Sequence, residues 1–174
     1  MVNAFSCMLK GKVTENDLVR DENVEKLGND LKREVDAVFG GSIAIRELDS
    51  GSDNATEIEI NNLSNAFYDA ERFGISFVAS PRHADVLLVT GAVTHNMAIA
   101  VKKTYDAMPS PKFVVAVGDD PCDGGIFAGT YAVLGRVDKI LPVDMKIPGN
   151  PPTPARILEG LLAVMRKARE GKRK

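Results

Sequence analysis

The chain has 174 residues, which is enough for one domain with a sizeable core. Its 22 basic and 24 acidic residues give a formal net charge of −2, which argues against a nucleic-acid partner. No apolar run approaches the roughly 20 residues of a membrane span, and the first residues lack the pattern of a secretory signal. Two cysteines, Cys7 and Cys122, are too few for a disulfide framework. We therefore expect a cytoplasmic globular protein.

An amphipathic helix is predicted near the N-terminus. Gly40 and Gly41 end this segment, as is typical of a helix C-terminus. A single apolar stripe favours a helix that lies on the rest of the domain or on a partner. We assign residues 1–41 to an N-terminal helical extension. The residues that recur at three- and four-residue steps are Val24, Leu27, Leu31, Val35 and Val38.

The next part of the chain alternates strand-like and helix-like segments. Short apolar runs bounded by Gly, Pro or Asp have the pattern of strands buried on both faces. Their alternation with helices predicts a three-layer α/β domain over residues 42–170, with a mainly parallel four-stranded sheet, before a basic tail at 171–174. The predicted strands are 42–48, 75–79, 85–90 and 112–117, and the predicted helices are about 56–67, 95–108 and 154–169.

Loops at the carboxyl ends of the strands are the expected place for a ligand, as in other sheets of this kind. Three loops, residues 49–55, 91–94 and 118–125, leave those ends, and the segment 148–152 can join them. The two histidines are twelve residues apart, and neither stands beside a nucleophile with a matching acid. No catalytic residue is therefore predicted.

Several segments together resemble one known family. Residues 51–60, GSDNATEIEI, resemble the family pattern G-x-C-N-G-C-D-I-E-I. Ser-Pro-Arg-His-Ala-Asp before an apolar strand is a second and more specific signal. Over residues 42–168 the chain resembles the 20 kDa subunit of NADH–quinone oxidoreductase (complex I), closest to the small subunit of group 4 membrane-bound [NiFe] hydrogenases and formate hydrogenlyases. The segments are 51–60 (GSDNATEIEI), 68–75 (YDAERFGI), 80–91 (SPRHADVLLVTG), 124–127 (GGIF) and 140–152.

The resemblance implies a flavodoxin-like domain that holds one [4Fe-4S] cluster through four cysteines and transfers electrons beside a large catalytic subunit. It implies as partners a hydrogenase-like or complex I 49 kDa-like large subunit and the other subunits of a membrane-bound complex. Through them the chain would lie on the cytoplasmic face of the membrane. By the same resemblance, Arg72, Arg82 and His83 belong to the framework and to the interface with the large subunit.

The four cysteine positions of the family carry oxygen-bearing side chains in this sequence. They are Asp53, Thr56, Asp120 and Asn150. Because an iron–sulfur cluster needs thiolates that converge on it, we expect a lost iron–sulfur site and no cofactor. A hard cation such as Mg²⁺ or Ca²⁺ is an alternative ligand for such oxygens. Asp and Asn also suit turns and helix starts for their own reasons, so no metal is assigned.

Two main hypotheses follow for the function. The first is a cluster-less paralogue of the electron-transfer small subunit that acts as a structural or docking subunit and is not catalytic by itself. The alternative is a redox subunit, of NADH–quinone oxidoreductase or formate hydrogenlyase type, with an unusual or partner-supplied [4Fe-4S] centre. A third class is a small-molecule binder at the strand ends. Self-association in isolation is a further option, because a face normally covered by a large subunit should be apolar.

Overall fold

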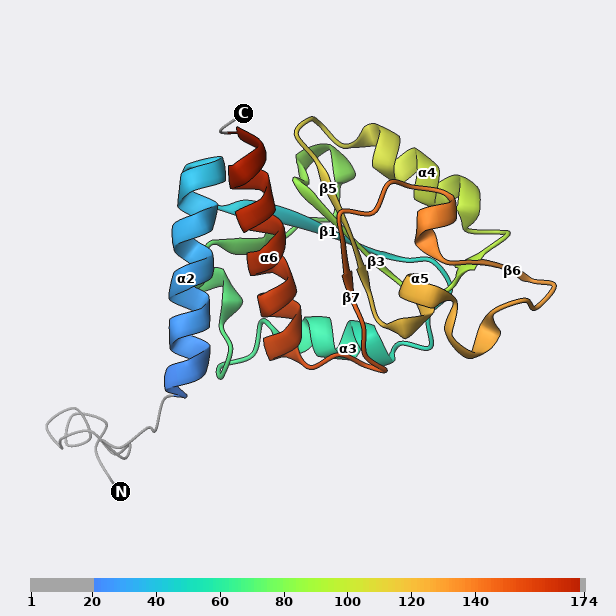
Figure 1. Cartoon of the computed structure of the whole chain (residues 1–174), viewed down its shortest axis with the longest axis horizontal. Coiled ribbons are helices and arrows are strands. Elements are labelled where there is room, and N and C mark those ends of the chain that lie inside the picture. Colours follow the sequence, from blue (N-terminus) through green and yellow to red (C-terminus); the bar gives the residue numbers. More distant parts are fainter. Residues whose placement is uncertain (1–20, 173–174) are drawn as a thin grey trace, which may run out of the picture.

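A computed structural model describes residues 21–172, which build three layers (Figure 1). The middle layer is a parallel sheet of five strands in the order β2-β1-β3-β5-β7, and an antiparallel pair of β4 with β6 stands apart from it. Residues 1–20 of the predicted extension and residues 173–174 of the basic tail lie outside the described residues. The strands are β1 (Ile43–Asp49), β2 (Ile75–Phe77), β3 (Val86–Thr90), β4 (Val93–Thr94), β5 (Phe113–Val117), β6 (Val133–Gly135) and β7 (Met145–Ile147).

Helices cover both faces of the sheet. In Figure 1, α2 and α6 lie side by side on one face, and α4 lies on the other. Within residues 21–172, no helix combines the length and the apolar character that crossing a bilayer requires. The α-helices are α2 (Glu22–Phe39), α3 (Ala55–Asn62), α4 (Ala98–Ala107), α5 (Asp119–Asp123) and α6 (Pro154–Lys172), and the 3₁₀ helices are η1 (Ala70–Phe73), η2 (Pro81–His83), η3 (Gly125–Phe127) and η4 (Val137–Lys139).

Alternate residues of the central strand β3 enter two separate cores. Val86 and Leu88 pack in the core that includes residues of α2 and α6, whereas Leu87 and Val89 pack in the core on the α4 side. Every residue of β3 is buried. Because successive side chains of a strand point to opposite faces, a continuous apolar run is buried completely only between two helical layers. The prediction of a three-layer α/β domain is confirmed.

Helix α2 is fixed to the domain by its caps and by an ion pair. The Asp21 side chain accepts a hydrogen bond of 2.9 Å from the Asn23 backbone, and Gly40, at φ 80°, ends the helix in the left-handed region. Glu34, only 7% exposed, accepts two hydrogen bonds of 3.1 Å from Arg169 on α6. The predicted N-terminal helix is therefore present, and its buried face belongs to the main core.

The sheet has one parallel strand more than the four predicted. The additional strand, β7, pairs with β5 at the edge of the sheet. It contains three residues, one of which is Lys146, so no apolar run marks it in the sequence. Two helices are also shorter than predicted, since α3 ends at Asn62 and α4 begins at Ala98.

Helix α2 approaches the Phe73 ring closely at Gly28. A Cβ on Gly28 would lie 2.2 Å from two atoms of the Phe73 ring. We expect Gly28→Val to lower the free energy of unfolding by about 1–3 kcal/mol, because overpacking displaces the ring or the helix. Urea unfolding followed by circular dichroism measures this change.

The matched control for this variant is Gly41→Ala, because a Cβ on Gly41 would meet no atom within 4 Å. Its expected effect is within about 0.5 kcal/mol. A Gly28→Val protein as stable as the unmodified chain would contradict the packing of α2 against η1.

Candidate functional site

The four positions predicted from the family pattern lie at one edge of the sheet. The parallel strands β1, β5 and β7 all end at this edge. The segments that follow them carry Asp53, Asp120 and Asn150, and Thr56 stands in the first turn of α3. We call this edge, formed by residues 49–56, 118–125 and 148–152, the carboxyl edge.

The segments of the carboxyl edge pack directly on one another. The Asp119 backbone donates a hydrogen bond of 2.9 Å to the Gly149 carbonyl, and the Gly149 backbone donates one of 2.8 Å to Asp119 Oδ1. Gly118, at φ 106°, approaches α3 so closely that a Cβ there would lie 3.0 Å from Thr56 Oγ1. The fold therefore brings together three segments that are far apart in the sequence.

The four positions differ in their exposure to solvent. Thr56 is 7% exposed, Asp120 is half-buried, and Asp53 and Asn150 are exposed. Asp53 Oδ1 accepts a hydrogen bond of 3.0 Å from the Ala55 backbone, which forms a turn at the start of α3. Asp53 therefore serves a local turn before α3, and the buried Thr56 side chain is part of the packing of the edge.

Negative charge is concentrated at the carboxyl edge. Burial raises the pKa of the Asp120 carboxyl, and repulsion from Asp53, Asp119 and Asp123 raises it further. Within residues 21–172, no three His, Cys, Asp or Glu side chains are grouped so that they could hold a metal ion.

Two glutamates beside the edge were not identified from the sequence. Glu57 on α3 is 7% exposed, and its Oε2 accepts a hydrogen bond of 2.6 Å from the Ser52 hydroxyl. Its Oε1 is buried with no hydrogen-bond partner among the described residues. Burial, and then repulsion from Glu57, raises the pKa of Glu47 on β1. The sequence contained one indication of Glu57, because this residue stands where the family pattern has an aspartate.

A cavity of about 310 Å³ opens beside Glu47, between β1, α3 and the segment after β2. None of its lining residues belongs to the loops 49–55, 91–94 and 118–125, at which a ligand was expected. The Nε of Arg46 is buried and has no partner among the described residues. The lining residues are Arg46, Glu47, Ile60, Asn61, Ser64, Phe77, Val78 and Ala79.

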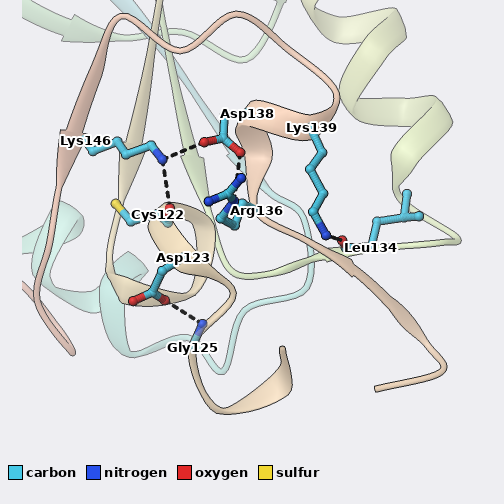
Figure 2. Close-up of polar contacts among 8 residues, drawn as sticks. All are labelled: Cys122, Asp123, Gly125, Leu134, Arg136, Asp138, Lys139 and Lys146. Carbon is cyan, nitrogen blue, oxygen red and sulfur yellow. Dashed lines mark hydrogen bonds and ion pairs between the residues drawn. The ribbon is translucent and has the colours of Figure 1, made fainter. Parts of the chain in front are cut away.

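Cys122 is a buried free cysteine at the end of α5 (Figure 2). Its Sγ lies 3.5 Å from the Ala116 carbonyl oxygen on β5. Burial raises the pKa of its thiol to about 11, so the thiol is protonated at neutral pH. Because the thiolate is the nucleophile and the metal ligand, Cys122 has the properties of a structural cysteine.

A polar network joins the elements around Cys122 (Figure 2). Lys146 on β7 donates a hydrogen bond of 3.0 Å to the Cys122 carbonyl and pairs with Asp138 on η4 at 2.7 Å. Arg136 Nε pairs with the other oxygen of Asp138 at 3.1 Å. The hydrogen bond from Lys146 lowers the pKa of Asp138, so the carboxylate is charged at neutral pH. The network connects α5, η4 and β7.

The three predicted interface residues lie away from the carboxyl edge. Arg72 on η1 precedes β2, and Arg82 and His83 on η2 precede β3, so all three are near the amino ends of the strands. Arg72 pairs with Glu25 on α2 at 2.7 Å and stacks over the Phe73 ring at 4.5 Å from its centroid. Arg82 and His83 are exposed. The structure therefore does not bring this set together with the four positions.

Comparison with known proteins places this arrangement in a family. The family described as NADH ubiquinone oxidoreductase, 20 Kd subunit, matches residues 54–164, which is more than half of the chain. The chain is 44% identical over 129 residues to the probable membrane-bound hydrogenase subunit mbhJ of Pyrococcus furiosus, covering 74% of this chain and 77% of the relative. It is 43% identical over 140 residues to formate hydrogenlyase subunit 7 of Escherichia coli, covering 80% of this chain but only 53% of that protein.

Solved structures agree with this result. A chain in the structure of the membrane-bound sulfane sulfur reductase (MBS), an archaeal respiratory membrane complex, has 36% identity and a TM-score of 0.67, covering 75% of this chain and 72% of that one. An NAD+-reducing [NiFe]-hydrogenase in the H2-reduced state shares the fold at 20% identity and a TM-score of 0.53, over 70% of this chain and 92% of that chain. The chain belongs to the family of the 20 kDa subunit of NADH ubiquinone oxidoreductase.

The expectation of no cofactor is wrong for a member of this family. The family is the 20 kDa or hydrogenase small subunit, which usually binds a [4Fe-4S] cluster. The side chains at the four positions are therefore compared with the ligands of a [4Fe-4S] cluster. Two carboxylates, a hydroxyl and an amide occupy the four positions, and these groups do not fit ligation by four thiolates. No step of electron transfer is assigned to them.

The reactivity of Cys122 tests its burial directly. In a Cys7→Ser chain, where Cys122 is the remaining thiol, we expect alkylation at pH 8 to be at least about a hundredfold slower in the folded than in the urea-unfolded protein. Raising the pKa from 9.0 to about 11 alone removes most of the thiolate. Equal rates in the folded and unfolded protein would contradict the described environment of Cys122.

Proposed function

We propose that this chain is a docking subunit of a membrane-bound hydrogenase-type or complex I-like assembly. One observation carries the proposal: the chain retains the framework of the small-subunit family while the four positions that resemble its ligand positions hold oxygen-bearing side chains. The relatives are named as subunits of membrane-bound hydrogenase and formate hydrogenlyase. The partner we propose is the large subunit of such a complex, and through it the chain lies peripherally on the cytoplasmic face of a membrane.

The docking surface we propose is the carboxyl edge. We include in this surface Ile58 of α3, which follows the segment 49–56 by two residues and is 52% exposed. Asp53 and Asn150 on the edge itself are exposed polar side chains. An exposed apolar residue within a polar rim is the usual composition of a protein–protein interface. In this proposal, residues 42–170 form the docking unit, and α2 from the N-terminal extension packs on it. Arg72, Arg82 and His83, predicted at the interface with the large subunit, lie near the opposite edge, so we propose that the partner reaches this edge as well.

Co-purification tests the docking role. The tagged chain is expressed together with the hydrogenase-like large subunit encoded in the same genome, and recovery of that subunit is quantified. We expect recovery in equal amounts with the unmodified chain and a loss of at least about tenfold with Ile58→Asp, because a buried charge opposes association. Asp53→Asn tests whether charge at the same edge contributes.

The matched control is Ile99→Asp, which places the same charge on α4, where Ile99 is 66% exposed. It should leave recovery of the large subunit unchanged. Failure of the unmodified chain to recover any large subunit, or equal losses with both variants, would contradict docking through the carboxyl edge.

Family membership favours a second candidate, a redox subunit with an unusual or partner-supplied [4Fe-4S] centre. Its support is that members of the family usually bind such a cluster. Iron and acid-labile sulfide analysis of the anaerobically purified complex distinguishes the two candidates. Stoichiometric iron that remains with this chain after the subunits are separated supports the redox candidate. Iron that remains entirely with the other subunits supports the docking role.

A further inference from the structure

The segment between α5 and β6 carries large apolar side chains into solvent. Ile126 is 83% exposed and Tyr131 is 97% exposed, and Phe127 between them is 37% exposed. We call residues 126–131 the apolar loop; in Figure 1 this segment projects at the end of the molecule remote from α2 and α6. Single exposed apolar residues are ordinary, but three within six positions mark an interaction site.

The apolar loop begins beside an acidic segment. Asp119, Asp120 and Asp123 precede it on α5. Two of these carboxylates accept hydrogen bonds from backbone groups, of Gly149 and Gly125, but none of the three forms a salt bridge within residues 21–172. The loop therefore presents apolar side chains next to unneutralised negative charge.

A groove of about 410 Å³ has the opposite charge. It lies between α4 and the segment that contains β6 and η4. Ile99, 66% exposed, forms part of its apolar lining. Lys102 and Lys103 line the groove, are exposed, and form no salt bridge among the described residues. The lining residues are Ala98, Ile99, Lys102, Lys103, Asp106, Leu134 and Ile140.

A third lysine adds to the positive charge at this groove. Lys139 on η4 donates a hydrogen bond of 2.8 Å to the carbonyl of Leu134, a lining residue (Figure 2). Its ammonium group is thus held near the end of the groove. Against these three lysines the groove lining supplies one carboxylate, Asp106.

We propose that the groove receives the apolar loop of a second copy of this chain. Ile126 and Tyr131 would enter the apolar part of the groove, and the aspartates of α5 would approach Lys102 and Lys103. A chain does not fill its own groove in this way, because its own Tyr131 is almost fully exposed. Association is either reciprocal between two copies or head to tail, since loop and groove are different surfaces. The proposal does not depend on docking through Ile58.

Sedimentation analysis of the full chain tests this association. We expect the mass of the unmodified protein to rise with concentration and to fall with added salt, because salt screens exposed charge pairs. Ile99→Asp and Tyr131→Asp should each weaken association at least about tenfold, since each places a charged group in the apolar part of the contact, where its desolvation opposes binding. Phe67→Asp is the control, because Phe67 is 52% exposed and lies outside the loop, the groove and the carboxyl edge, and this variant should associate like the unmodified chain.

Mixing the Ile99→Asp and Tyr131→Asp chains is the decisive experiment. The Ile99→Asp chain keeps an intact loop, and the Tyr131→Asp chain keeps an intact groove, so an equal mixture should form a one-to-one complex that neither variant forms alone. The proposal is overturned if the unmodified chain stays monomeric at every concentration. It is equally overturned if the mixture associates no more than the separate variants. Far-ultraviolet circular dichroism of each variant confirms that the fold is retained.

Discussion

The parallel pairing of β1, β3, β5 and β7 is the constraint on which the rest of the molecule depends. Parallel strands end at the same edge of a sheet, so the segments that follow them must meet there. The two hydrogen bonds between Asp119 and Gly149 and the close approach of Gly118 to Thr56 are consequences of this pairing. The fold thus brings these segments together at the carboxyl edge, independently of the side chains that they carry.

The side chains at that edge give it a particular character. Carboxylates, a hydroxyl and an amide stand at the four positions, and the nearby thiol of Cys122 is buried and protonated at neutral pH. Oxygen-bearing groups suit turns, helix starts and hydrated contacts with another protein, whereas a [4Fe-4S] cluster is held by thiolates. The chain therefore combines the framework of its family with oxygen-bearing side chains at this edge.

The sequence predicted the layers and the position of the site better than the contacts within it. The apolar run of β3 could be recognised because burial on both faces requires every residue to be apolar or small. The three residues of β7 could not, since Lys146 interrupts them. The family pattern placed Asp53, Thr56, Asp120 and Asn150 at one edge. The pairing of Arg72 with Glu25, 47 residues away, depends on the packing of α2, which no local pattern encodes.

Hydrogen–deuterium exchange of this chain, alone and in its purified complex, tests the central claim most directly. If the carboxyl edge is a docking surface, the backbone amides of α3 and of residues 49–56 should exchange more slowly in the complex than in the dilute isolated chain. The amides of α2 should exchange equally in both states, because that helix is already packed on α6. Unchanged exchange throughout α3 and residues 49–56 in the complex would contradict the account.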